Sequence, residues 1–499
     1  MKHARPAIRA TSPVRATALE PAATARRPVG GSPNRTREAP GDAEIPQEHG
    51  TRNAAFYLFC AFLVSYFGRL PNRVPVLGVI HFDLLLAACT LMAIVAGRSS
   101  RAGRFNFAQM DPVARRLWIL LGYIVVTIPF VEWPGSALHN LEPYAKSVCF
   151  FFFVLATVDT TRKLKTLVAV YVALEVWRVL EPLYLHVTSG YWGNRASLGN
   201  WEVMNRLSGA PHDIINANGL GFVVIITLPM LQFLIKPDTL VRRFAWLAVA
   251  GAMCYALVLS ASRSSFLALV FLCLFVIWRS KNRAAWLAVA VAGAVVVTIL
   301  MTGAERDRYR SIVSHDAPGA VTAEGRITGL IGDFKISLRR PLFGHGIGTS
   351  LEANSHFRNE FRRSHNLYTE AAQELGYVGL GLLLALIYSF VRACWTAQQL
   401  VSATATSDER LRFLHRVSVS LVVVVAVDLF FSFAAYGLSE PYWYFIGGLS
   451  VVTARLAMRL SPAALEVANS GRAGRAARRR ARLRVRATGS RAAPGLGMR

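Results

Sequence analysis

The chain has 499 residues and a formal net charge of +27, yet only 17% of its residues are charged and 53% are hydrophobic. Soluble domains carry about one quarter charged residues, whereas here the apolar residues form blocks of about 20, the length that crosses a bilayer core. The composition excludes a soluble protein and predicts an all-α polytopic membrane protein. The six cysteines lie inside apolar blocks without CxxC spacing, so they indicate neither a disulfide framework nor a metal site.

Both ends of the chain are basic and poor in large apolar residues. Residues 1–52 are rich in Ala, Arg and Pro, and no apolar signal-peptide core lies near the start. Residues 459–499 are richer still in Arg. We expect two solvated cytoplasmic tails attracted to anionic membrane lipids, in preference to tails that bind RNA or a protein partner.

About twelve apolar segments between the tails have the hydropathy of membrane-spanning helices. Nine of them fall in residues 53–301 and three in residues 367–458. Their approximate limits are 54–67, 77–97, 117–131, 144–158, 166–186, 214–235, 244–260, 264–278, 284–301, 375–397, 417–436 and 441–458.

The loops between these segments alternate between basic and nearly neutral. Lys and Arg concentrate in 98–116, 162–165, 236–243, 279–283 and 392–416. Cytoplasmic loops carry this excess in membrane proteins. The alternation therefore predicts a multi-pass protein with both termini in the cytoplasm.

Two loops on the opposite, outer face are long. Residues 302–366 form a loop between predicted helices 9 and 10, and residues 187–213 form the second-largest outer segment. Loops of this length without a function are uncommon. We therefore expect the functional site on the outer face.

Three polar residues on that face are candidates for chemistry. Arg263, in LSASRSSFL, lies at the outer membrane edge, where a cation is costly unless it meets an anion or water, although a snorkelling arginine is the alternative. Arg326, in TAEGRITGL, is by itself an ordinary loop arginine. His365, in SHNLYTEAAQELGYVGLGLLLAL, is either a proton acceptor or a surface residue at a helix start, where Ser364 and Asn366 are the ordinary capping residues.

Two further patterns point away from this site. One is expected to be a simple turn, and the other supports an alternative function. The stretch GHGIG, residues 344–348, lacks the strand–turn–helix context of a phosphate loop and is expected to be a turn. Glu175, Arg178 and Glu181 share one face of a predicted membrane helix, where charges pair or line a cavity. Such groups favour a transporter as the alternative function, although no clear repeat relates the two halves of the chain.

The motifs, in their order and spacing, resemble the O-antigen ligase and polymerase family of bacterial membrane glycosyltransferases. The resemblance rests on LSASRSSFL, EGRITGLIGDFKISLRRPLFGHGIG and SHNLYTEAAQELGYVGLGLLLAL, with a weaker contribution from PHDIINANGLGFVVIITLPM. It covers roughly residues 216–386. It implies a glycosyltransferase C-type fold of about twelve membrane helices, with the large periplasmic loop between helices 9 and 10.

The same resemblance implies transfer of a glycan from undecaprenyl diphosphate to an acceptor hydroxyl at the periplasmic face of the bacterial inner membrane, without metal or cofactor. Arg263 and Arg326 match the diphosphate-binding arginines and His365 matches the catalytic histidine, while Arg206 is a weaker diphosphate or sugar contact. Guanidinium groups suit a leaving diphosphate, and the expected attack inverts the anomeric centre. A ligase acting on lipid A–core, a polymerase acting on lipid-linked glycan and a protein-directed transferase all remain open.

Overall fold

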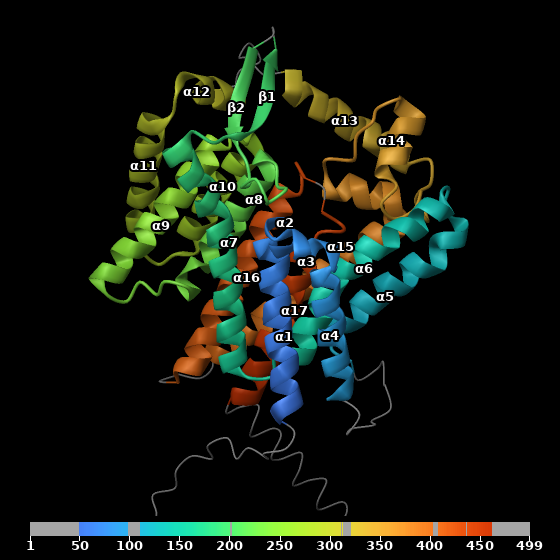
Figure 1. Ribbon diagram of the computed structural model, residues 1–499, viewed down its shortest axis with the longest axis horizontal. Coiled ribbons are helices and arrows are strands. Elements are labelled where there is room, and N and C mark those ends of the chain that lie inside the picture. Colours follow the sequence, from blue (N-terminus) through green and yellow to red (C-terminus); the bar gives the residue numbers. More distant parts are fainter. Residues whose placement is uncertain are drawn as a thin grey trace, which may run out of the picture. The chain divides into compact units, whose positions relative to one another are not determined.

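The computed structural model describes residues 49–97, 110–199, 202–310, 312, 321–402, 408–435 and 437–461. Most of these residues are helical (Figure 1). The first half contains α1 (His49–Gly68), α2 (Leu70–Arg73), α3 (Pro75–Val79), α4 (Phe82–Ala96), α5 (Pro112–Thr127), η2 (Ile128–Phe130), α6 (Pro134–Thr157), α7 (Thr161–Ser189), β1 (Gly193–Gly199), β2 (Glu202–Leu207), α8 (Ala217–Thr227) and η3 (Leu228–Phe233). The second half contains α9 (Leu240–Leu259), α10 (Arg263–Arg279), α11 (Arg283–Leu300), α12 (Gly303–Arg310), α13 (Val321–Ser337), α14 (Ser350–Arg358), α15 (Leu367–Ser402), α16 (Glu409–Phe431) and α17 (Pro441–Leu460).

Each apolar segment predicted from the sequence lies on one or two of these helices. Four described helices are both long and apolar enough to cross a membrane: Pro112–Phe130, Leu240–Leu259, Leu367–Val401 and Glu409–Phe431. The structure therefore supports a helical membrane protein, while the count of about twelve spans stays a prediction. The predicted tails lie outside the described residues, except where α1 begins at His49 and α17 ends at Leu460.

Polar side chains determine where several of these helices begin. The Asp111 carboxylate accepts from the Val113 amide at 2.9 Å, and the Asn216 side chain accepts from the Gly219 amide at 2.9 Å. These side chains satisfy amide groups that have no partner within the first helical turn. An apolar run consequently starts at a defined residue on each helix.

The centre of the helical part is α17, which is buried along most of its length. It packs against α6 and α15. Gly447 and Gly448 allow this approach, since a Cβ on either would press against Phe390 of α15 or Val154 of α6. Aromatic side chains fill the remaining space, with the Tyr171 and Phe445 ring centroids 4.7 Å apart.

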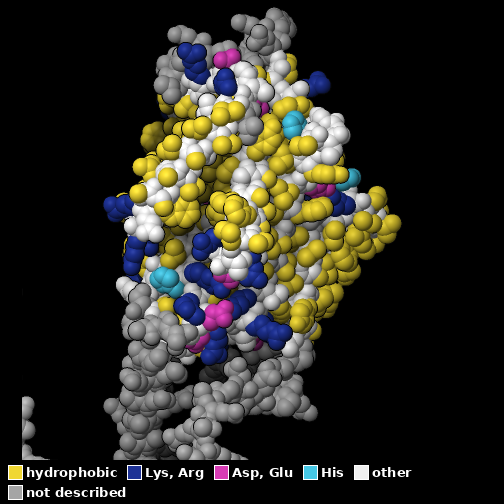
Figure 2. Space-filling model, turned by 90° about the vertical axis from the view of Figure 1, so that its left-hand side faces the viewer, with side chains coloured by type: hydrophobic (Ala, Val, Ile, Leu, Met, Phe, Trp, Pro, Cys, Tyr) yellow, Lys and Arg dark blue, Asp and Glu magenta, His cyan; other side chains and the backbone are white. Residues whose placement is uncertain are grey.

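An apolar surface covers the face formed by α9, α10 and α11. Figure 2 shows hydrophobic side chains across the middle of this face and charged side chains gathered toward its ends. The exposed apolar residues include Leu240, Val241, Phe244, Leu247, Leu287, Val291 and Ile299. A face of this kind matches the hydrocarbon of a bilayer bounded by two polar interfaces.

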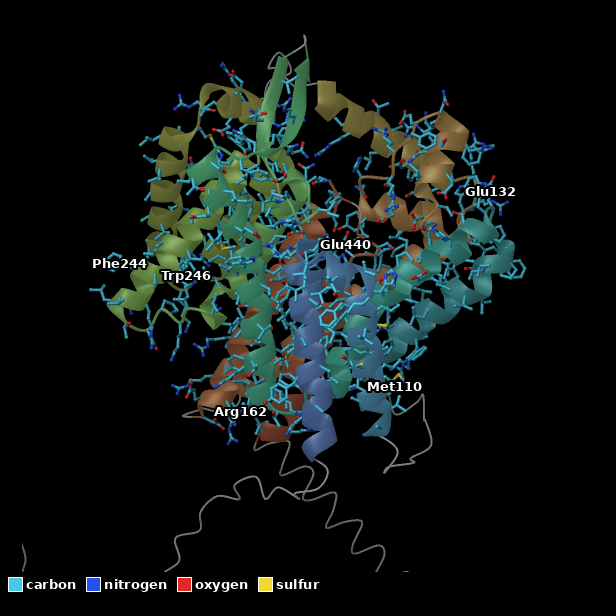
Figure 3. The ribbon with its side chains drawn as sticks, in the orientation of Figure 1. Met110, Glu132, Arg162, Phe244, Trp246 and Glu440 are labelled. Carbon is cyan, nitrogen blue, oxygen red and sulfur yellow. The ribbon has the colours of Figure 1, made fainter. Side chains whose placement is uncertain are left out.

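Four labelled residues at the helix ends show how these ends are arranged. Arg162 and Met110 lie toward one end of the helices, and Glu132 and Glu440 lie away from that end (Figure 3). The alternation of basic and neutral loops assigns the first pair of loops to one side of the membrane and the second pair to the other. The arrangement is compatible with that prediction.

The two long loops that the sequence places on the outer face hold ordered structure at one end of the helices (Figure 1). Loop 302–366 contains α12, α13 and α14 in its described parts. Loop 187–213 contains an antiparallel hairpin with Gly193 opposite Leu207 and Asn194 opposite Arg206. The hairpin departs from the all-α expectation. Its strand sequences, GNRASLG and EVMNRL, lack the alternation of apolar and polar residues that indicates a strand.

Helix α15 contains a break at Gly376 that separates a polar first part from the apolar membrane segment. Gly376 has φ 70° and ψ 178°, a conformation that essentially only glycine adopts. A Cβ there would also collide with the carbonyl oxygen of Leu342. The break joins α15 to the loop before α14, because the Tyr377 amide donates to the Pro341 carbonyl at 2.7 Å.

We predict that Gly376→Ala lowers the free energy of unfolding by at least about 1–3 kcal/mol, the usual cost of a strained backbone conformation. Gly381→Ala is the matched control, because it lies in the same helix and a Cβ there meets nothing within 4 Å. Thermal unfolding of the purified protein in detergent measures both variants. Equal melting temperatures for the two would contradict the role given to the break.

Candidate functional site

The turn between α9 and α10 carries Arg263. Ala261 has a positive φ of 45° although it is not glycine, and it is fully buried. The Ser262 side chain accepts from the Ser265 amide and so begins α10. Arg263 is therefore the first residue of α10, and its side chain is half-buried.

Two arginines from distant parts of the chain hold this turn in place. Arg206 of β2 donates from Nε to the Ser260 carbonyl at 2.8 Å, and Arg308 of α12 donates from Nε to the Ala261 carbonyl at 2.8 Å. Arg206 also donates to Asn218 Oδ1 at 2.7 Å. Both guanidinium groups are buried, so the strained turn is fixed by charged donors from each outer loop.

Arg308 and Arg326 lie close enough to Arg206 for their positive charges to lower its pKa. Burial lowers the pKa of Arg206 to about 9, and the positive charges of Arg308, Arg326 and Arg263 contribute to the lowering. Burial lowers the pKa of Arg308, with a further contribution from Arg326. Burial also lowers the pKa of Arg326. The result is a cluster of four like charges, defined as Arg206, Arg263, Arg308 and Arg326, which a bound anion would stabilise.

His365 lies just before α15 and does not cap it. The Asn366 side chain accepts from the Tyr368 amide at 2.9 Å and the Thr369 amide at 3.1 Å, so Asn366 is the capping residue. Part of the His365 side chain is exposed. Partial desolvation nevertheless lowers its pKa below the usual histidine value, and the positive charges of Arg326 and Arg362 lower it further. The imidazole therefore stays neutral to a lower pH than an isolated histidine.

Glycines on α13 bring Arg326 near His365. A Cβ on Gly329 would strike the guanidinium of Arg362, and a Cβ on Gly332 would strike that of Arg358. Arg362 also donates to the Gly325 carbonyl at 3.2 Å, and Arg358 donates to the Gly329 carbonyl at 3.3 Å. The segment that leads to His365 is thus packed along the glycine face of the helix that carries Arg326.

The GHGIG stretch is a turn, as the sequence predicted. Gly344, Gly346 and Gly348 all have positive φ. The turn is held by the buried Glu374 of α15, whose carboxylate accepts from the Gly348 amide at 2.7 Å. His345 within it is fully buried and lies 2.7 Å from the Glu132 carboxylate. This stretch therefore connects α13, α14 and α15.

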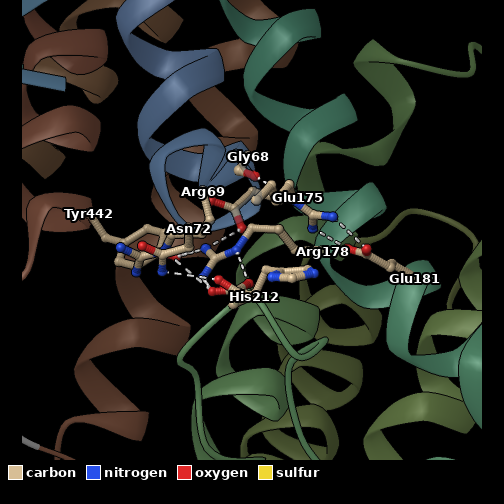
Figure 4. Close-up of polar contacts among 10 residues, drawn as sticks. Gly68, Arg69, Asn72, Glu175, Arg178, Glu181, His212 and Tyr442 are labelled. Carbon is tan, nitrogen blue, oxygen red and sulfur yellow. Dashed lines mark hydrogen bonds and ion pairs between the residues drawn. The ribbon is translucent and has the colours of Figure 1, made fainter. Parts of the chain in front are cut away.

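The charged residues of α7 that favoured a transporter form ion pairs and hydrogen bonds, most of them with other segments of the chain. Arg178 donates to Asp213 at 2.7 Å and 3.0 Å and to the Tyr442 hydroxyl at 2.8 Å (Figure 4). It also lies 3.2 Å from Glu175. Glu181 accepts from Arg73 at 2.6 Å. These contacts tie α7 to the segment between the hairpin and α8, and hence to Arg206.

The structure brings together the residues that the sequence singled out and adds one that it did not. The positive charges of Arg263, Arg308 and Arg326 lower the pKa of Arg206, and the charge of Arg326 lowers the pKa of His365. Nothing in ERDRYR separates Arg308 from an ordinary solvated helix residue. Among the described residues, no group of three His, Cys, Asp or Glu side chains could hold a metal ion. Metal independence stays a prediction.

The fold and the site define a helical membrane protein with an arginine cluster near a histidine at one end of its helices. Residues 248–384 match the family model described as O-antigen ligase. The match runs from α9 into α15 and contains Arg263, Arg308, Arg326 and His365, whereas Arg206 precedes it. It confirms the resemblance to the O-antigen ligase and polymerase family. No curated protein matches the chain.

We predict that Arg178→Met lowers the free energy of unfolding by about 3–5 kcal/mol, because Glu175 would remain buried without its ion-pair partner and Asp213 would keep only Arg69, at 3.3 Å. The double variant Arg178→Met/Asp213→Asn should recover part of that loss. Lys146→Met, in the exposed Glu142–Lys146 pair, is the control and should have little effect. Thermal unfolding in detergent measures all three; a wild-type melting temperature for Arg178→Met would contradict a structural role for the network.

Proposed function

We propose that the protein transfers a glycan from undecaprenyl diphosphate to an acceptor hydroxyl at the periplasmic face of the bacterial inner membrane. The observation that carries the proposal is the cluster of four arginines near a partly exposed histidine, of which Arg263, Arg308, Arg326 and His365 lie within the residues that match the O-antigen ligase family model. In this proposal loop 302–366 is periplasmic and both tails are cytoplasmic. The diphosphate then meets the cluster at the level of the lipid headgroups.

The arginines would act on the leaving group. Arg263 and Arg326 are half-buried and can present guanidinium donors to the diphosphate oxygens, whereas Arg206 and Arg308 are buried and fix the turn that carries Arg263. Negative charge on the diphosphate increases as its bond to the sugar breaks. Preorganised cationic donors stabilise that charge more in the transition state than in the ground state.

His365 would act as the general base. Its imidazole takes the proton of the acceptor hydroxyl while the hydroxyl oxygen forms a bond to the anomeric carbon. The bond between that carbon and the diphosphate oxygen breaks, and undecaprenyl diphosphate leaves with the electron pair. Attack opposite the leaving group inverts the anomeric centre. The lowered pKa keeps the imidazole in its accepting form at neutral pH.

A ligase that acts on lipid A–core is the preferred form of the proposal, and an O-antigen or exopolysaccharide polymerase is the alternative. The surface polysaccharide of a deletion strain separates them. Lipid A–core without polymer indicates a ligase, and core capped by a single repeat unit indicates a polymerase. A polysaccharide that is unchanged in the deletion strain would contradict both.

We predict that His365→Ala abolishes glycan transfer while leaving the amount of folded protein in the membrane unchanged, because the capping residue is Asn366. His356→Ala, an exposed histidine of α14, is the control and should retain transfer. The assay uses reconstituted protein with lipid-linked glycan. Wild-type transfer by His365→Ala would remove His365 from the chemistry.

We predict that Arg263→Lys loses most of the transfer activity, since a single ammonium cannot present the two parallel donors of a guanidinium. Folded protein should remain, because the turn before residue 263 is held by Arg206 and Arg308. Transfer rates at saturating donor measure the effect. Full activity with lysine would contradict bidentate binding of the diphosphate.

We predict that kcat falls as the pH drops through a value below about 6.5, the ordinary histidine pKa. Protonation removes the base, and the lowered pKa of His365 moves this loss to lower pH. Arg326→Gln removes a nearby positive charge, so the loss in its residual activity should move to higher pH. The pH–rate profiles of the two proteins test this, and profiles with the same midpoint would contradict the assignment of the base.

A further inference from the structure

A cavity adjoins the proposed reaction centre on the side of His365. Its volume is about 450 Å³, and it is lined by Gly325, Thr328, Glu360, Phe361 and Arg362. Gly325 precedes Arg326 on α13, and Arg362 is close enough to lower the pKa of His365. The cavity is therefore next to the proposed base, and it is an open surface pocket rather than an enclosed one.

Resting on the proposed function, we propose that this cavity is the subsite for the acceptor saccharide, with the Phe361 ring covering one face of a sugar unit. Phe361 is 87% exposed, the most exposed of the large hydrophobic residues in the described part of the chain. A pyranose presents C–H groups on its ring faces and hydroxyl groups around its rim. An exposed aromatic ring next to a cavity provides the apolar contact that such a face requires.

The polar groups of the cavity complement the hydroxyl rim. Glu360 Oε1 accepts from Arg358 Nη2 at 2.7 Å, and Glu360 Oε2 forms an ion pair with Arg362 Nε at 2.7 Å. Carboxylate oxygens retain further lone pairs and a guanidinium has five N–H donors, so the pair can both accept from and donate to sugar hydroxyls. The Arg362 side chain is fixed against Gly329 and the Gly325 carbonyl. The subsite is thus formed before the ligand arrives, which limits the entropy lost on binding.

The position of the cavity favours the acceptor over the diphosphate. Arg206 and Arg308 contact the turn that carries Arg263, whereas Arg362 lies near His365 and its positive charge lowers the pKa of that imidazole. The cavity consequently lies at the histidine end of the cluster, where the acceptor hydroxyl must lose its proton. A ring inserted into the outer leaflet is the other use of an exposed Phe361, and this use needs neither a cavity nor the Glu360–Arg362 pair.

The test measures steady-state transfer by the full-length reconstituted protein in three Phe361 variants. Phe361→Ala and Phe361→Leu should each raise the acceptor KM by about three- to tenfold, the loss expected for one aromatic contact. Phe361→Tyr keeps the ring and should stay near wild type. The donor KM should be unchanged in all three. Phe334→Ala, an exposed phenylalanine of α13 that does not line the cavity, is the control.

Two results would overturn the proposal. An unchanged acceptor KM in Phe361→Ala shows that the cavity does not bind the acceptor. A normal KM in Phe361→Leu together with a raised KM in Phe361→Ala shows an apolar contact with the bilayer instead.

A binding measurement separates this proposal from the proposed function. The probes are core oligosaccharide released from the lipopolysaccharide of the source strain and, separately, oligosaccharide of its O-antigen repeat unit, neither carrying a diphosphate. The His365→Ala protein and the double variant His365→Ala/Phe361→Ala are compared for binding of these probes. Weaker binding by the double variant supports the subsite even if wild-type protein transfers no glycan. Transfer by wild-type protein without any effect of Phe361→Ala on binding or KM refutes the subsite alone.

Discussion

The site depends on two arginine–carbonyl contacts at the turn between α9 and α10. Arg206 and Arg308 come from different outer loops, yet each donates to one of two successive carbonyls, those of Ser260 and Ala261. These contacts stabilise a left-handed, buried alanine, a conformation that persists only when its surroundings impose it. They also fix the hairpin and α12 relative to the first residue of α10. The placement of Arg263 thus follows from bonds made by residues about fifty positions away on either side.

The same contacts concentrate positive charge where burial makes it costly. Burial lowers the pKa of Arg206 to about 9, and the positive charges of Arg308, Arg326 and Arg263 contribute to the lowering. In the proposed function, the bound diphosphate offsets this cost. On α7, Arg178 is paired with Asp213 and Glu175.

The histidine is positioned by a second set of interactions. Glycines on α13 admit the side chains of Arg358 and Arg362, which align the segment before His365 with the helix of Arg326. On the other side, buried Glu370 accepts from the amides of Gly437 and Leu438 at 2.8 Å and 3.2 Å, and Glu374 holds the GHGIG turn. The first part of α15 is therefore anchored to two loops before the break at Gly376. This rigidity allows an exposed imidazole to be kept next to the arginine cluster.

The sequence by itself determined the helical segments, the two long outer loops, the turn at GHGIG and the candidates Arg206, Arg263, Arg326 and His365. Apolar length and periodicity are local properties, and the motif order carried the family resemblance, so neither required coordinates. Only the tertiary structure decided that Asn366 caps α15, that α7 charges are paired with distant partners, that loop 187–213 forms a hairpin, and that Arg308 belongs to the cluster. Each of these depends on contacts between residues far apart in the chain, and a hydrogen bond between Arg308 and the Ala261 carbonyl leaves no periodic or compositional trace in the sequence.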